Sequence, residues 1–250
     1  MHNYRLRRRS RPAFIALAFI VLTAGAVAVA GPVAQRSAAK ARAVAPPKIG
    51  DTHIGSDDAG DTLAAWTRGT SIEASVQAAG AGAWSPSQVL VKMNFPVGYW
   101  SLAVGRDGLA LLVWERRIGA TSTIWARTAR LPGTAWSPAV RISGPAGVGV
   151  RAVVQAAVSP DGRAIAVWRE RHGPSYVLLG AARAAGAGAW TAPSQSLGSA
   201  CPGAFTPELS AGGGPATAAW VCFERNRTTR LRSAKITASG ALARTFTIAR

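Results

Sequence analysis

Short apolar runs that follow a glycine turn and end at a tryptophan recur along the chain. The clearest example is Ser159–Arg171, in which Ser-Pro-Asp-Gly opens a turn and Ala-Ile-Ala-Val leads to Trp168. Such runs lack strict alternation, which is typical of a strand that is covered on both faces. A short apolar run also fits a buried helix, but the flanking Gly, Pro and Asp favour a strand.

Four tryptophans occupy the same place in this pattern, each six residues after a glycine. Two of the glycines follow an aspartate, which is the signal of an Asp-Gly hairpin turn. Charged or polar residues, Glu115 and Arg169 among them, come directly after the tryptophans, so we expect each strand to run from the core into water there. We expect the tryptophans to pack in the core and the glycines to make turns. The pairs are Gly60 and Trp66, Gly108 and Trp114, Gly162 and Trp168, and Gly214 and Trp220.

A second tryptophan element lies further along in three of these units. Trp84, Trp136 and Trp190 each follow a glycine-containing turn and precede Ser or Thr. The four main tryptophans are 48, 54 and 52 residues apart. A period near fifty residues with about four short strands per unit is typical of propeller blades. Because one thin antiparallel sheet cannot bury both of its faces, each predicted blade needs neighbours.

The sequence therefore predicts an all-β fold, a β-propeller-like array of about four four-stranded antiparallel blades after an N-terminal signal or anchor helix. Residues 50–250 form the predicted repeat domain. Two β-sandwiches are the alternative, since two of these units make about one hundred residues. The expected blades are 50–95, 96–145, 146–200 and 201–250.

The N-terminus has the pattern of an export signal. A basic segment precedes a mostly apolar uncharged one, and Ala-Val-Ala stands before Gly31, so residues 1–30 are a predicted signal peptide. An uncleaved membrane anchor over 13–30 is the alternative, because that length is borderline for a span. In both cases we expect a secreted or extracytoplasmic protein, since the arginines stay inside. Residues 31–49 predict a disordered linker.

The formal charge of +18 predicts attraction to anionic partners such as a cell-surface glycan or another anionic polymer. The arginines are scattered through the units, however, and no dense basic run with interleaved aromatics follows the N-terminus. We therefore expect no specific nucleic-acid partner. Membrane contact is expected only through the N-terminal segment, if it is not cleaved.

Both cysteines lie in the last predicted blade. Folding its first hairpin about Gly212 and Gly213 brings Cys201 close to Cys222. In an exported chain this placement predicts a disulfide. Two free buried thiols are the alternative.

The sequence carries no convincing catalytic set. His53 and His172 are the only histidines beyond the N-terminal segment, and they stand far apart in the repeating frame, so we expect no metal site. Nucleophile-elbow, phosphate-loop and dinucleotide motifs are absent from the sequence, and no cofactor is expected.

These units resemble those of secreted bacterial sialidase-like propellers, the superfamily of Asp-box repeat proteins. The resemblance rests on residues 161–168 (Asp-Gly-Arg-Ala-Ile-Ala-Val-Trp) and on the three elements around the second tryptophans, and it extends over 50–250. An Asp-box would carry aspartate five residues before each of these tryptophans, where this chain has Ala79, Leu131 and Ala185. The resemblance thus implies the repeat fold without the Asp-box itself.

Enzymes of that superfamily use three arginines, a Tyr/Glu pair and an aspartate, but no motif transfers these roles to residues here. Tyr99 is the one plausible nucleophile, since Tyr176 falls on a predicted outer strand. We therefore expect a non-enzymatic exported binding or scaffold protein. A sialidase-like glycoside hydrolase and a partial propeller completed by a partner chain are the alternatives. The expected ligand residues are Tyr99, Trp100 and Arg151, at the face where first strands begin, with inner-strand packing as their other possible role.

Overall fold

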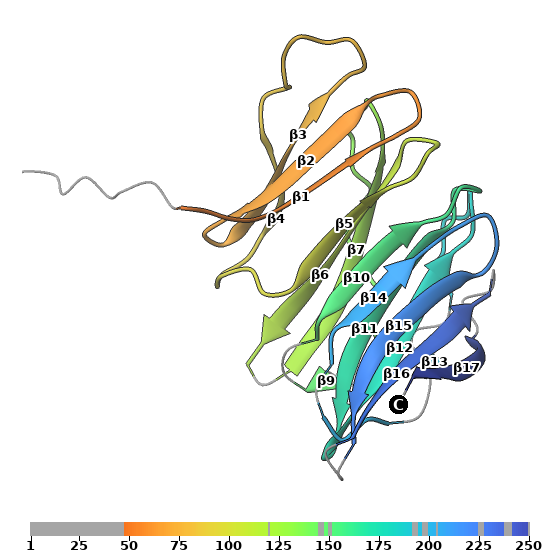
Figure 1. The fold of residues 1–250 in the computed structure, drawn as a ribbon. Coiled ribbons are helices and arrows are strands. Elements are labelled where there is room, and N and C mark those ends of the chain that lie inside the picture. The colour runs from red at the N-terminus through yellow and green to blue at the C-terminus, as the bar shows by residue number, and fades with distance from the viewer. Residues whose placement is uncertain are drawn as a thin grey trace, which may run out of the picture. The chain divides into compact units, whose positions relative to one another are not determined.

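The computed structural model describes residues 48–250 except 120, 145–147, 150–151, 192–194, 197–199, 204, 225–227, 238–241 and 250. The predicted signal peptide and nearly all of the predicted linker lie outside the described residues. The described chain is all-β, and its regular elements are strands (Figure 1). Over these residues there is no helix of the length and apolarity that crossing a membrane requires.

The described strands form four antiparallel sheets, and within each sheet the strands follow one another in chain order. The first sheet contains β1 (Ile49–Ser56), β2 (Thr62–Arg68), β3 (Ser71–Gln77) and β4 (Gln88–Lys92). The second contains β5 (Trp100–Val104), β6 (Leu109–Ile118), β7 (Thr121–Arg130) and β8 (Val140–Arg141), with β9 (Val148–Gly149) also paired to β7. The third contains β10 (Val154–Val158), β11 (Ala164–His172), β12 (Ser175–Arg183) and β13 (Gln195–Ser196). The fourth contains β14 (Pro207–Ser210), β15 (Ala216–Phe223), β16 (Thr229–Ile236) and β17 (Leu242–Ala249).

The first strands of the four sheets lie side by side in chain order. Contacts join β1 to β5, β5 to β10 and β10 to β14. Between the second and third sheets the Ala156 N–H donates to Ser101 Oγ at 3.1 Å. β9 departs from the expected boundary after residue 145, because it pairs with Thr121 and Ser122 of the second sheet. A strand of two residues is too short to leave a pattern in the sequence.

The four main tryptophans lie on the second strands, β2, β6, β11 and β15. Trp114, Trp168 and Trp220 are buried, each in a cluster formed with the sheet that precedes its own. Trp66 is only half-buried. It lies on the side of β2 opposite Leu63 and Ala65, which pack toward the second sheet.

β11 shows why its sequence does not alternate. Ala166 and Trp168 on one face pack against the second sheet, while Ile165 and Val167 on the other pack against the fourth. All four side chains are fully buried. A strand with a sheet on each side must be apolar at successive positions.

The second tryptophan elements end in a hydroxyl that joins the sheet. Ser85, Ser137 and Thr191 each follow a tryptophan of this kind. Their hydroxyls accept hydrogen bonds from the backbone N–H of Val76, Thr128 and Ala182 at 3.0, 3.0 and 3.1 Å. Each hydroxyl thus satisfies a third-strand donor at the same place in three sheets, which gives the Trp-Ser/Thr pattern a structural reason.

The turn glycines differ between sheets. Gly108 and Gly162 have φ of 79° and 75°, and a Cβ at either would meet a carboxylate oxygen of the preceding sheet's turn, from Asp57 at 3.0 Å or Asp107 at 2.9 Å. Only glycine satisfies both conditions. Gly60 is also left-handed, whereas Gly214 is not and has open space around it. The fourth sheet therefore lacks this turn-to-turn contact.

Cys201 and Cys222 form a disulfide, as predicted, with the two sulfurs 2.17 Å apart. Cys201 also exchanges two backbone hydrogen bonds, each 2.7 Å long, with Tyr176 of β12, while Cys222 lies on β15. The bond therefore links the edge of the third sheet to the fourth. Disulfides persist in oxidising compartments outside the cytosol.

Candidate functional site

A cavity of about 500 Å³ opens where β5 begins and β6 ends, at the edge of the second sheet. Its size suits a small ligand or one unit of a larger one. Aromatic, acidic and basic side chains meet in its wall. The lining residues are Phe95, Pro96, Gly98, Tyr99, Glu115, Arg117 and Gly119.

Antiparallel pairing places Tyr99 beside Glu115. Trp100 and Trp114 are direct partners in the sheet, and the next pair outward continues the ladder, since the Glu115 N–H donates to the Tyr99 carbonyl at 2.8 Å. Tyr99 remains 38% exposed. The structure therefore brings an accessible phenol ring to a carboxylate that lies 115 − 99 = 16 residues away in sequence, which no local motif encodes.

Glu115 is held in one position. The residue is only 5% exposed. Its Oε1 accepts hydrogen bonds from the Ser122 hydroxyl at 2.5 Å and from the Ala152 N–H at 3.2 Å. A Cβ at Gly98 would stand 2.7 Å from Oε2, so glycine makes room for the carboxylate. Buried acids need such partners. The expectation that the chain enters water directly after Trp114 is wrong at Glu115.

Arg169 holds the corresponding place in the third sheet, directly after Trp168. Its Nη1 donates to the Phe205 carbonyl at 2.5 Å, and its guanidinium carbon lies 5.2 Å from the centre of the Tyr176 ring. Burial lowers the pKa of Arg169, and Tyr99, Tyr176 and Glu115 oppose that shift. The guanidinium is therefore within electrostatic reach of the pair at the cavity.

A smaller cavity of about 250 Å³ adjoins the first at Phe95, which lines both. Lys92 and Arg116 bring positive charge to it, and Ile118 borders it at the tip of the β6–β7 hairpin. Cations therefore extend along this edge beyond Arg117.

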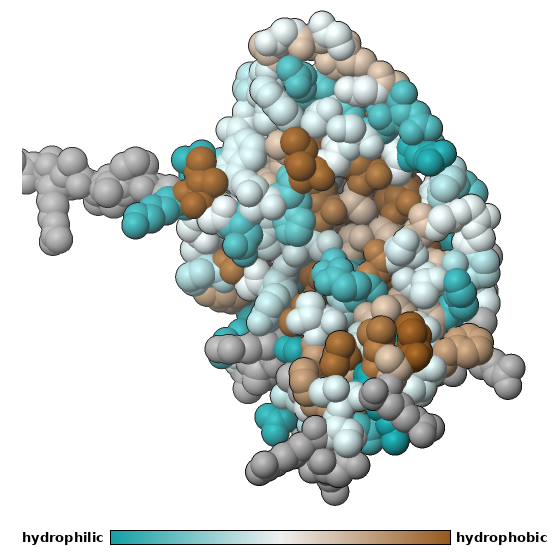
Figure 2. Space-filling view, viewed as in Figure 1, coloured by the Kyte–Doolittle hydropathy of each residue, from teal (hydrophilic) through white to brown (hydrophobic). Residues whose placement is uncertain are grey.

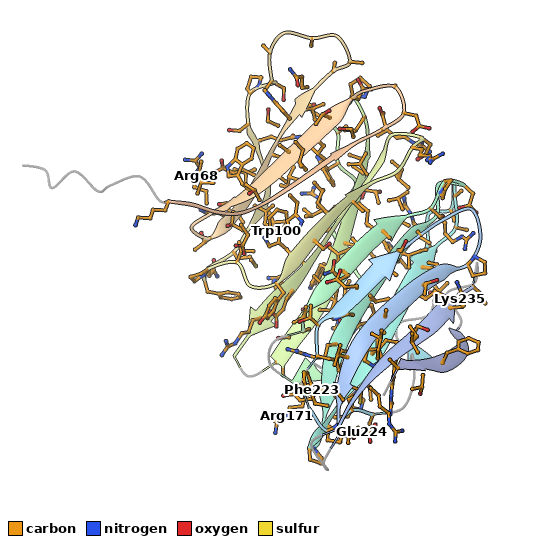
Figure 3. All side chains as sticks on the ribbon, in the orientation of Figure 1. Arg68, Trp100, Arg171, Phe223, Glu224 and Lys235 are labelled. Carbon is orange, nitrogen blue, oxygen red and sulfur yellow. A yellow bond between two sulfur atoms is a disulfide. The ribbon has the colours of Figure 1, made fainter. Side chains whose placement is uncertain are left out.

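The structure separates the three residues that the sequence pointed to as ligand contacts. Tyr99 lines the large cavity. Trp100 is buried and its ring meets that of His53 edge-on, 4.3 Å between centres, so it packs between the first two sheets (Figure 3). Arg151 lies outside the described residues. Glu115, Arg117 and Arg169 were missed; the only signal in the sequence was that charge follows the tryptophans.

An aromatic face next to fixed polar groups can hold a sugar ring, whose C–H face stacks while its hydroxyls form hydrogen bonds. Hydrolysis of a glycoside usually needs two carboxyl groups. Among the described lining residues of the large cavity, Glu115 is the single carboxylate. In the described part of the chain no three His, Cys, Asp or Glu residues are grouped as a metal ion would require.

No protein-family model matches this chain, and no curated protein matches it. Among solved structures, a glycosyl hydrolase from Bacteroides ovatus is similar at a TM-score of 0.44 and 10% identity, over 80% of this chain and 70% of that one. A variant of NanB sialidase from Streptococcus pneumoniae is similar at a TM-score of 0.43 and 16% identity, over 73% of this chain and 26% of that one. GH43B of the Bacteroides ovatus xyloglucan PUL is similar at a TM-score of 0.39 and 14% identity, over 79% of this chain and 41% of that one. All three similarities are distant.

Proposed function

We propose that this protein is an exported, β-propeller-like, non-enzymatic binding protein, and that the cavity at Tyr99 receives an acidic glycan. The observation that carries the proposal is the exposed ring of Tyr99 beside the fixed carboxylate of Glu115 in a cavity of about 500 Å³.

The architecture supports a propeller-like arrangement. Consecutive antiparallel sheets of about four strands, with their first strands side by side, are what successive blades require. Export is supported by the disulfide and by the basic and then apolar pattern at the N-terminus.

The ligand class follows from the residues around the cavity. Tyr99 and Phe95 offer apolar ring faces, and Glu115 offers an acceptor whose position is fixed. Arg117 borders the cavity, and Lys92 and Arg116 border its neighbour, so a carboxylate or sulfate on the sugar would meet positive charge. Residues 1–30 carry five arginines and no acidic residue, so the rest of the chain keeps a formal charge of 18 − 5 = +13. This charge would draw a polyanion toward the surface from a distance.

A sialidase-like hydrolase is the second candidate, because Tyr99 and Glu115 are cross-strand neighbours at this edge and both act electrostatically on Arg169. The usual need for two carboxyl groups weighs against it, since Glu115 is the single carboxylate among the described lining residues. One substitution separates the two functions. Tyr99→Phe keeps the ring face for stacking and removes the hydroxyl that a nucleophile would need.

The test measures binding of a tetragalacturonate, and of a neutral galactose oligomer of the same length, to the full-length protein by calorimetry. We expect Tyr99→Ala to weaken binding by at least about tenfold, as loss of a stacking contact does, and Tyr99→Phe to bind within about twofold of the parent. Arg117→Gln should weaken the acidic oligomer more than the neutral one. Trp84→Ala, which removes an exposed aromatic side chain outside the cavity lining, is the matched control.

Unchanged affinity in Tyr99→Ala would overturn the proposed site. A screen of fluorogenic glycosides covers the second candidate. Turnover by the parent that is lost in Tyr99→Phe would establish the hydrolase instead, because that variant retains the stacking surface.

A further inference from the structure

The three apolar clusters between neighbouring sheets are each built from the same two faces. One side is the tryptophan face, the face of a sheet that carries the main tryptophan of its second strand; the other is the opposite face of the sheet before it. Trp114 packs against the first sheet, Trp168 against the second and Trp220 against the third. Three successive interfaces therefore join a tryptophan face to an opposite face.

The tryptophan face of the first sheet is open. Cross-strand register places Ile54 with Ala64, and Glu73 with both Trp66 and Val89, on this face. Ile54 is 69% exposed, Val89 is exposed, and Trp66 is only half-buried. Trp66 thus occupies the position of Trp168, but no sheet of the described part of the chain covers it.

The opposite face of the fourth sheet is open as well. Val221 and Phe223 lie on the side of β15 away from Trp220, and register places Phe246 of β17 on the same side through Ser233 and Ala219. Val221, Phe223 and Phe246 are all exposed. Figure 2 shows hydrophobic residues at the surface over the fourth sheet, and Figure 3 places Phe223 at the end of β15.

We propose that a second copy of this chain closes the array. The tryptophan face of the first sheet in each copy packs on the opposite face of the fourth sheet in the other, so that two copies form a two-fold symmetric ring of eight sheets. This inference goes beyond glycan binding and rests on the propeller-like arrangement proposed above.

The occupant is argued from continuity with the interfaces inside the chain. The tryptophan face of the first sheet needs an opposite face to pack against, and the opposite face of the fourth sheet needs a tryptophan face. A second copy supplies both at once, and a two-fold axis makes the two new contacts identical. Closure removes two exposed apolar patches, which monomeric soluble proteins rarely present. Eight sheets lie within the range of blade numbers that propellers use.

The first experiment measures the mass of the full-length protein by sedimentation velocity and native mass spectrometry. We expect twice the mass of one copy. Ile54→Glu on the tryptophan face and Val221→Glu on the opposite face should each raise the dimer dissociation constant on the order of 30-fold, the effect of losing a central interface contact. Ile118→Glu is the matched control, because Ile118 is 61% exposed at a hairpin tip and belongs to neither end face; it should leave the mass unchanged.

The second experiment tests which faces meet. Single-cysteine variants Ala64→Cys and Ala219→Cys, in which the native cysteines remain paired, are treated with a short bifunctional maleimide alone and after mixing. Cross-linked dimer should form in the mixture and not in either variant alone, because each contact joins one tryptophan face to one opposite face.

A parent protein of single-copy mass at every concentration would overturn the proposal. So would an open polymer of growing mass, or cross-linking of a single variant with itself. Circular dichroism spectra that match the parent exclude misfolding as the cause of a lost dimer, since both glutamates enter at exposed positions. Binding of tetragalacturonate is measured separately, because neither end face lines the cavity at Tyr99. A dimer that does not bind the glycan would refute only the proposed function.

Discussion

Trp168 and Trp66 hold the same place in the sequence pattern and the same place on the second strand of a sheet, yet only Trp168 is fully buried. Among the described residues, the third sheet has a neighbour on each side, whereas the first sheet packs against a neighbouring sheet only on its Leu63 and Ala65 side. The pattern therefore determines which face a tryptophan occupies. The neighbouring sheet determines whether that face is buried.

The strands at the two ends differ from β11 in the same sense. β11 is buried at five successive positions, whereas burial alternates along β15 and along the first part of β2. Thr62 and Thr217 lie on the open faces of β2 and β15. These open faces mix apolar and polar side chains. Such a composition suits a contact between separate chains better than the interior of one chain.

The largest expected effect lies at the covered position. Trp168→Ala should lower the free energy of unfolding by about 3–5 kcal/mol, because a fully buried indole leaves a cavity between two sheets. Urea denaturation followed by circular dichroism measures it. A loss under about 1 kcal/mol, the size of an ordinary surface change, would contradict a core role for Trp168.

Removing the link between the third and fourth sheets should have the next largest effect. The double variant Cys201→Ala/Cys222→Ala is expected to lose about 3 kcal/mol, because the disulfide closes a loop of 21 residues in the unfolded chain. Urea denaturation of parent and variant under non-reducing conditions gives the difference. A thiol assay on the denatured, unreduced parent is the control; finding two reactive thiols would refute the bond.

Trp66→Ala sharpens the comparison with Trp168. Because Trp66 is half-buried, its loss should reduce the free energy of unfolding by about 1–2 kcal/mol in the single chain. The measurement is urea denaturation at a protein concentration where the parent is a monomer. A cost equal to that of Trp168→Ala would mean that the first sheet is covered within one chain, and would remove the distinction drawn between the two ends and the middle.

The smallest effect is a pH dependence at the junction of the first and second sheets. Burial beside Trp100 holds the pKa of His53 below its ordinary value, and Asp51 acts in the opposite direction. Below about pH 6.5, and above the lowered pKa of the folded state, His53 binds a proton in the unfolded chain but not in the folded chain. The free energy of unfolding therefore falls as the pH is lowered through this range.

Urea denaturation of the parent and of His53→Phe, which keeps an aromatic ring against Trp100, measures this dependence on either side of that window. The slope with pH should be smaller in the variant. Equal slopes would show that His53 does not contribute to the loss of stability in mild acid.

Much of the fold could be predicted from local patterns. The strand before Trp168 is expected over residues that β11 includes, and the disulfide between Cys201 and Cys222 follows from folding one hairpin. The Ser or Thr after each second tryptophan was recognised as a landmark, and the hydroxyl that accepts a third-strand N–H explains it. These features depend on short-range spacing, which the chain carries explicitly.

The candidate site could be predicted only in part. Tyr99 stood out because it is one of few tyrosines, but Glu115 had the signature of a residue entering water. Its partners come from Ser122 on the next strand and from Ala152 at the start of the third sheet. Trp100 was expected at the ligand and lies in the core instead, because the first sheet covers it through His53.

The sequence by itself determined the all-β class, the glycine turns and the repeated place of the main tryptophans, because strand propensity and turn conformation depend on a few neighbouring residues. Only the tertiary structure decided which faces are covered, which charge is buried and where a cavity opens. Those outcomes depend on contacts between sheets about fifty residues apart, and the desolvation and packing that govern them exist only once the sheets meet.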